Sequence, residues 1–105
     1  MADELPQPYQ DFTKQYPKIA EAYEALGSAT HEAGPLDDRT RRLIKLAIAV
    51  GGRLEGAVRA HARQAKAAGV SDEEIDHVVL LAMTTIGLPS TVAARTWVMD
   101  ALSEA

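Results

Sequence analysis

The residue best suited to chemistry in this sequence is His61, which lies in a basic segment of an otherwise acidic chain. Residues 39–66 hold eight basic residues and one acid, Glu55, a net charge of +7. The rest of the 105-residue chain holds three basic and fourteen acidic residues, a net charge of −11. An imidazole can donate or accept a proton near neutral pH. We therefore consider proton transfer at His61, with nearby arginines binding a negatively charged compound.

His61 also has a purely structural interpretation. It falls on the apolar stripe of a predicted helix, where a lone histidine is more often a hydrogen-bonded core residue than a catalyst. The basic segment has three interpretations. It could be a solvated face, a surface on which one subunit meets the acidic helices of another, or a site that captures a carboxylate. The residues alone leave these alternatives open.

Composition argues against several other kinds of chemistry. The chain has no cysteine, which removes disulfides, thiolate metal ligands and thiol nucleophiles. Its three histidines fall on three different predicted helices without the spacing of a metal site, so we expect no metal. His77 follows Glu73 by four residues, which indicates a surface pair. Nucleic acid is a disfavoured partner, because the chain is acidic overall and has no recognition motif.

The same sequence predicts a location in the cytoplasm and no association with a membrane. No apolar run approaches the roughly 20 residues that a membrane-spanning helix needs. The first ten residues lack the basic and then apolar layout of a signal peptide.

Hydrophobic spacing predicts an all-α protein, a single bundle of six helices. In the arm, residues 1–35, two helices meet at Pro17, and the arm holds four of the five aromatic residues. We expect it to pack as a lid over the other helices. A third helix, ending at Gly51-Gly52, is apolar almost all round after Leu43, and so should be the most buried element.

The remaining predicted helices follow from stripes and caps. A fourth helix begins near Arg53 and ends at Gly69, with Leu54, Ala57 and His61 on its apolar stripe. Glu55 and Arg59 are expected to pair at i, i+4 on the opposite side. Residues 71–74 form a capping box that starts a fifth helix, which continues to Ile86. A last helix runs from about residue 89 to 102.

The segment from Leu36 to about residue 102 resembles the carboxymuconolactone decarboxylase/alkylhydroperoxidase-like (AhpD-like) family. The most specific features are the spacing of His61 to Gly69, the following SDEEI, and the GLP at residues 87–89. The resemblance implies an all-α fold and homo-oligomers, commonly hexamers built from dimers or trimers, with sites near subunit boundaries. It makes residues 36–105 the core of the domain, with residues 1–35 as an arm of the same domain.

The resemblance also bears on chemistry, residue by residue. Peroxidase members have a CxxC motif, and its cysteine positions correspond here to Leu54 and Ala57. The glutamate that relays protons in those members corresponds to Arg42. The resemblance therefore implies no thiol peroxidase activity.

The decarboxylase branch retains the histidine and needs no cofactor. It implies acid/base (lyase-type) chemistry on a small anionic organic acid or lactone. His61 would be the catalytic proton donor or acceptor, and Arg42 and Arg53 would bind carboxylates. Glu55, the second catalytic candidate, would orient one of these arginines. The alternative is a non-catalytic oligomeric member that binds a small molecule or has a structural role.

Overall fold

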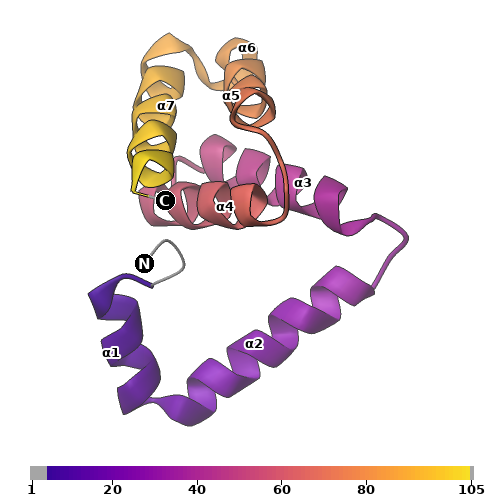
Figure 1. Ribbon diagram of the computed structural model, residues 1–105, viewed down its shortest axis with the longest axis vertical. Helices are drawn as coiled ribbons and strands as arrows, with labels where there is room; N and C mark the ends of the chain where they lie inside the picture. Colours follow the sequence, from indigo (N-terminus) through magenta and orange to yellow (C-terminus); the bar gives the residue numbers. More distant parts are fainter. Residues whose placement is uncertain (1–4, 105) are drawn as a thin grey trace. The chain divides into compact units, whose positions relative to one another are not determined.

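The computed structural model describes residues 5–104 and divides into two compact units, residues 5–36 and residues 37–104. The first unit contains α1 (Gln7–Gln15) and α2 (Pro17–Glu32). The second contains the remaining helices, α3 (Asp38–Gly51), α4 (Glu55–Ala67), α5 (Asp72–Leu81), α6 (Met83–Ile86) and α7 (Leu88–Ser103) (Figure 1). The described residues form no strand. The predicted all-helical fold is therefore confirmed, with six helices of nine residues or more and the short α6.

The first unit contains the described part of the arm. Its two helices meet at Pro17, as the sequence predicts. Tyr16 leaves the helical conformation, with φ of −126° and ψ of 65°, and so ends α1, and Pro17 begins α2. The rings of Phe12 and Tyr16 contact each other, with 5.3 Å between their centroids. Neither helix fully buries a residue. The expectation that the arm covers the other helices as a lid stays a prediction, and residues 1–4 of the predicted arm lie outside the described residues.

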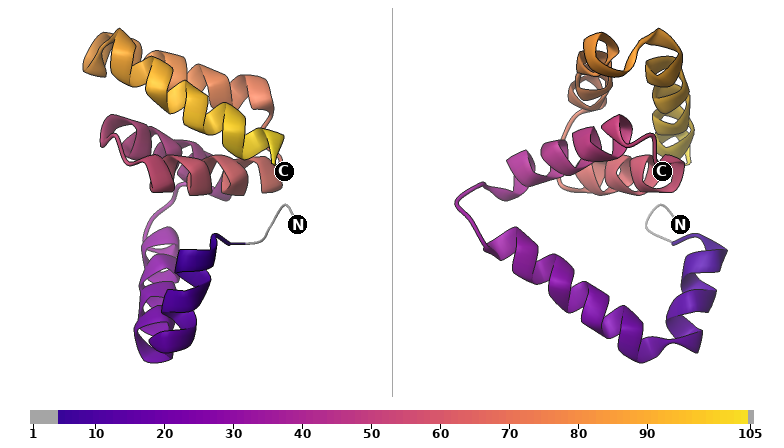
Figure 2. Two further views of the ribbon diagram at one scale, coloured as in Figure 1. Left: turned by 90° about the vertical axis from the view of Figure 1, so that its left-hand side faces the viewer. Right: turned by 180° about the vertical axis from the view of Figure 1, so that it is seen from behind.

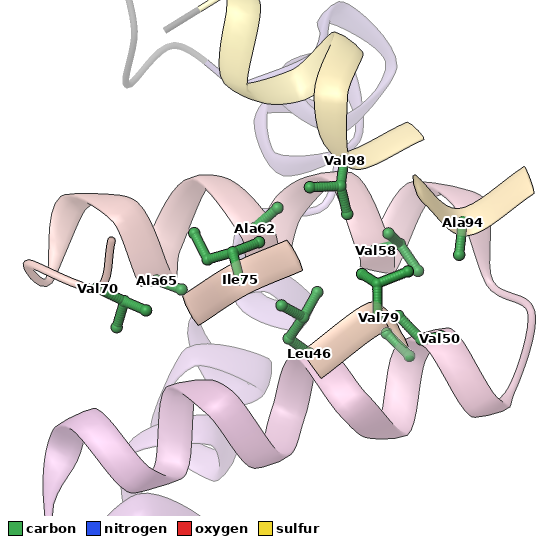
Figure 3. Close-up of a cluster of buried hydrophobic side chains, with 11 residues drawn as sticks. Leu46, Val50, Val58, Ala62, Ala65, Val70, Ile75, Val79, Ala94 and Val98 are labelled. Carbon is green, nitrogen blue, oxygen red and sulfur yellow. The ribbon is translucent and has the colours of Figure 1, made fainter. Parts of the chain in front are cut away.

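The second unit, the core unit, has two layers. One layer is the pair α3 and α4, and the other is α5, α6 and α7 (Figure 2). The side chains between the layers are small or medium in size, which lets the helices approach closely. Figure 3 shows them between the ribbons: Leu46, Val50, Val58, Ala62, Ala65, Val70, Ile75, Val79, Ala94 and Val98.

The third helix is buried on one side, not all round as the sequence predicts. Leu46 is inaccessible and Val50 is 1% exposed, whereas Ile44 and Ile48 are 39% and 66% exposed. The periodicity of the helix explains this result, because residues 46 and 50 share one side and residues 44 and 48 share another. The chain thus has an apolar face on α3 that its own core unit does not cover.

Two other expected elements differ from the structure in detail. The predicted fifth helix is broken at Ala82 into α5 and α6, and Gly87, with φ of 90°, ends α6. The fourth helix begins at Glu55, so Leu54 is its N-cap and is 55% exposed. The sequence predicts that Leu54 belongs to the buried stripe of this helix, and this prediction is wrong. No helix in residues 5–104 has the length and hydrophobicity to cross a bilayer, and cytoplasmic location stays a prediction.

The capping box at the start of α5 is confirmed and also links α5 to α3. The Ser71 hydroxyl accepts from the Glu74 backbone N–H at 3.1 Å, and the Glu74 carboxylate accepts from the Ser71 backbone N–H at 3.0 Å. The Arg39 guanidinium also donates to Glu74. The hydrogen bond from Arg39, followed by those from Ser71, lowers the pKa of Glu74 from 4.5 to about 2.

This carboxylate makes the stability of the core unit depend on acidity. Because its pKa is lower in the folded than in the unfolded chain, its contribution is complete above pH 4.5 and is lost as the pH falls toward about 2. We expect Glu74→Gln to reduce the free energy of unfolding at neutral pH and to flatten its acid dependence, measured by urea denaturation across this range. Glu73→Gln, in the same helical turn, is the control. Equal acid dependence in wild type and Glu74→Gln would contradict this account.

Candidate functional site

His61 lies in the middle of α4 and is half-buried. The buried side of this helix consists of Val58, Ala62 and Ala65, so His61 stands at the border between that side and the surface. Its position on α4 agrees with the prediction. Such a border position suits proton transfer, because the imidazole is held by packing while part of it remains accessible.

Arg42 approaches the same side of α4 from α3. Its Nη1 donates to Oε1 of Gln64 at 3.4 Å, and its Nε lies 3.4 Å from Oδ1 of Asp38. Gln64 follows His61 by three residues, and side chains at this spacing are neighbours on a helix surface. The structure therefore places a guanidinium within about one helical turn of His61.

Glu55 lies in the first turn of α4, two turns before His61. Its Oε2 accepts from Nε of Arg59 at 3.1 Å, which confirms the predicted i, i+4 pair. Arg59 also reaches Asp100 on α7, with 3.5 Å between Nη2 and Oδ2. The carboxylate of Glu55 is thus bonded to Arg59, which joins α4 to α7, rather than to Arg42 or Arg53. A catalytic role for Glu55 stays a prediction.

Arg53 lies at the other end of α3 from Arg42, in the turn before α4. About ten residues of helix and turn separate the two arginines, roughly 15 Å along the helix axis. Nε of Arg53 donates to Oγ of Ser90 at 3.0 Å, and its Nη2 donates to the carbonyl oxygen of Ile86 at 3.4 Å. The structure does not bring the two predicted carboxylate-binding arginines together, and it uses the donors of Arg53 to tie this turn to α6 and α7.

The backbone of Arg53 is unusual as well. Its φ of 56° is the only positive value among the described non-glycine residues. A side chain in this region costs roughly 1 kcal/mol or more. The hydrogen bonds to Ile86 and Ser90 offset that cost, which explains why an arginine stands where a glycine would be less strained.

A separate groove opens between α3, α5 and α6, with a volume of about 550 Å³. We call it the α3–α5–α6 groove. Three polar residues line it, Glu74, His77 and Thr85, together with the apolar residues Leu43, Ile44, Ala47, Val78, Leu81, Ala82 and Ile86. His61 is not part of this lining. The sequence around His77 indicates only a surface pair and does not predict the groove, because nothing in α3 or α5 alone shows which faces meet.

The described residues contain no group of three histidine, aspartate or glutamate side chains arranged to hold a metal ion. The candidate groups that come nearest to each other are the imidazole of His61 and the guanidinium of Arg42, which is bonded to Gln64 one turn away. Together they can transfer a proton and bind an anion.

The comparisons with known proteins identify the family. The model of the carboxymuconolactone decarboxylase family matches residues 17–100, so the chain belongs to this family. The match begins at α2, earlier than the resemblance noted in the sequence, and so includes part of the arm.

A solved structure and a curated sequence are also similar to this chain. A carboxymuconolactone decarboxylase family protein from Legionella pneumophila, solved in its apo form, has a TM-score of 0.75 and 26% identity, covering 92% of this chain and 86% of that one. An uncharacterized protein of Haemophilus influenzae is 54% identical over 52 residues, which are 50% of this chain and 46% of that protein. The match thus spans about half the length of that curated relative.

The structural role of Arg53 leads to a prediction about stability. We expect Arg53→Ala to lower the free energy of unfolding by about 1 kcal/mol or more, because two hydrogen bonds are lost while the strained backbone remains. Arg53→Gly should recover part of this loss, since glycine accepts the positive φ. Urea denaturation followed by circular dichroism measures both. If Arg53→Ala is as stable as wild type, the tie to α6 and α7 has no energetic importance.

Proposed function

We propose that this protein is a cofactor-independent enzyme that transfers a proton on a small organic acid or lactone bearing a carboxylate. The observation that supports it is the position of His61, half-buried on α4 with Arg42 bonded to the residue one turn away. The absence of cysteine supports the same choice, because the chain has no nucleophile for thiol chemistry.

In the proposed reaction, Arg42 binds one carboxylate of the substrate, and His61 stands next to the carbon that is to be protonated. When a carbon–carbon bond to a second carboxylate breaks, carbon dioxide leaves and the electron pair stays on the carbon, delocalised into a neighbouring carbonyl. Protonated His61 then gives its proton to that carbon and recovers a proton from solvent. A guanidinium suits the binding step, because its planar fork matches a carboxylate.

This proposal gives Arg42 the main part in substrate binding. Arg53 donates to Ser90 and to Ile86, and Glu55 accepts from Arg59. We therefore propose that Arg53 and Glu55 act by holding α4 against α6 and α7. Contact of Arg53 with the substrate stays a prediction of the sequence.

A non-catalytic binding protein is the second candidate. The observation in its favour is that Arg42, Arg53 and Glu55, three of the four predicted site residues, are engaged in hydrogen bonds within the chain. Under this proposal Arg42 binds a carboxylate, and His61 contributes only to packing or to an interface.

We also propose that the working form is a homo-oligomer, with a hexamer as the expected size. Its support is the number of large apolar side chains that the core unit leaves open, including Ile48 at 66%, Leu81 at 65% and Leu88 at 57% exposure. Soluble monomers rarely expose extended apolar patches. Sedimentation at micromolar concentration tests it, and a monomer would contradict it.

His61→Ala separates the two candidate functions. Against a panel of lactones and β-keto acids, we expect the variant to lose about 10²-fold or more of any turnover shown by wild type, the usual contribution of a general acid or base. His77→Ala, the control, should retain its activity. Unchanged turnover in His61→Ala would rule out its role in proton transfer.

Binding of the substrate carboxylate is tested by ligand-induced changes in melting temperature. We expect dicarboxylates to raise the melting temperature of wild type and of His61→Ala, but not that of Arg42→Ala, which lacks the guanidinium. Stabilisation without turnover would favour the binding protein. A dicarboxylate that stabilises Arg42→Ala as much as wild type would show that Arg42 does not hold it.

A further inference from the structure

A carboxylate of the chain itself lies beside Arg42, the arginine that we propose binds the substrate. Oδ1 of Asp38, in the first turn of α3, lies 3.4 Å from Nε of Arg42 and 3.6 Å from Nη2 of Arg41. One carboxylate oxygen is thus shared by two guanidinium groups. Asp38 therefore stands where the carboxylate of a bound ligand would approach Nε of Arg42.

The contact between Asp38 and Arg42 is an ion pair without a hydrogen bond. Nε of Arg42 is buried and has no hydrogen-bond partner, although Oδ1 of Asp38 is near. A shielded donor that makes no hydrogen bond costs free energy, and the donors of a guanidinium match a carboxylate that lies in their plane. A ligand carboxylate aligned with this edge of Arg42 would therefore gain an interaction that Asp38 does not make.

Asp38 can leave this position at small cost. Its side chain is 52% exposed, and an ion pair between exposed side chains contributes little to stability. The carboxylate also keeps a cationic partner when it moves away from Arg42, because Arg41 contacts the same oxygen. Gln64 of α4 meanwhile accepts from Nη1 of Arg42 at 3.4 Å, which helps to keep the guanidinium in place.

We propose that Asp38 competes with the substrate for Arg42 and moves toward Arg41 when a ligand carboxylate binds. The inference rests on the proposed binding of a carboxylate by Arg42, and it names the residue that sets the strength and selectivity of that binding. An anion must outweigh the contact with Asp38 before it binds. A carboxylate can do so through the planar fork of the guanidinium, whereas a halide offers charge alone.

Isothermal titration calorimetry with succinate, a simple dicarboxylate, tests the proposal on the full-length chain. We expect Asp38→Asn to lower the dissociation constant about two- to fivefold, the range that an exposed ion pair contributes. Asp37→Asn is the matched control. It removes the same charge from the neighbouring residue, and asparagine still caps α3 through Thr40, so we expect no comparable change.

A double-mutant cycle separates the movement toward Arg41 from the general effect of the charges. We expect Arg41→Gln to weaken succinate binding in the wild-type background, because Asp38 then loses the partner toward which it moves. In the Asp38→Asn background the same substitution should have a much smaller effect. Equal effects in the two backgrounds would overturn the movement toward Arg41.

The fluorescence of Trp97, half-buried against the core cluster, reports whether each variant is folded. Succinate that binds wild type and Asp38→Asn equally would overturn this inference and leave the proposed function standing. Asp38 would then serve only the N-terminus of α3, where an acidic side chain is favourable. Succinate that binds neither protein would contradict the proposed binding by Arg42, and this inference with it.

Discussion

Close packing between α3 and α4 is the constraint on which the rest of the structure depends. The two helices meet through Leu46 and Val50 on one side and Val58, Ala62 and Ala65 on the other, and α5 and α7 close the same cluster. Small side chains on α4 allow this approach. The packing brings Arg42 to Gln64, beside His61, and it leaves the opposite side of α3 open. The candidate site and the apolar groove are thus two consequences of one arrangement.

The charges of the basic segment serve different purposes within this arrangement. Arg39 joins α3 to α5 through Glu74, Arg59 joins α4 to α7 through Asp100, and Arg53 joins the α3–α4 turn to α6 and α7. Exposed pairs of this kind contribute little stability one by one, but they connect the two layers of the core unit at several points. Much of the positive charge that suggests anion binding in the sequence is therefore used for positioning. Arg42 of α3 donates to Gln64, one turn after His61 on α4, and is the arginine that we propose binds the substrate.

The sequence predicts best those features that depend on neighbouring residues. The start of α2 at Pro17, the capping box at Ser71 and the pair of Glu55 with Arg59 all involve residues at most four apart, and all are confirmed. Features that depend on distant partners are predicted less well. An apolar residue such as Ile48 has the same spacing whether it faces its own core or a second molecule. Likewise, nothing near Arg53 indicates that its partners are Ile86 and Ser90.

The central claim is that His61 and Arg42 act on the same anionic molecule. The most direct measurement is nuclear magnetic resonance of the three histidine side chains, assigned with His→Ala variants, during titration with a dicarboxylate. The account predicts that the imidazole signals of His61 shift in wild type and that this response is lost in Arg42→Ala, while the signals of His77 stay unchanged in both. A dicarboxylate that leaves His61 unaffected, or that shifts it equally without Arg42, would contradict the account.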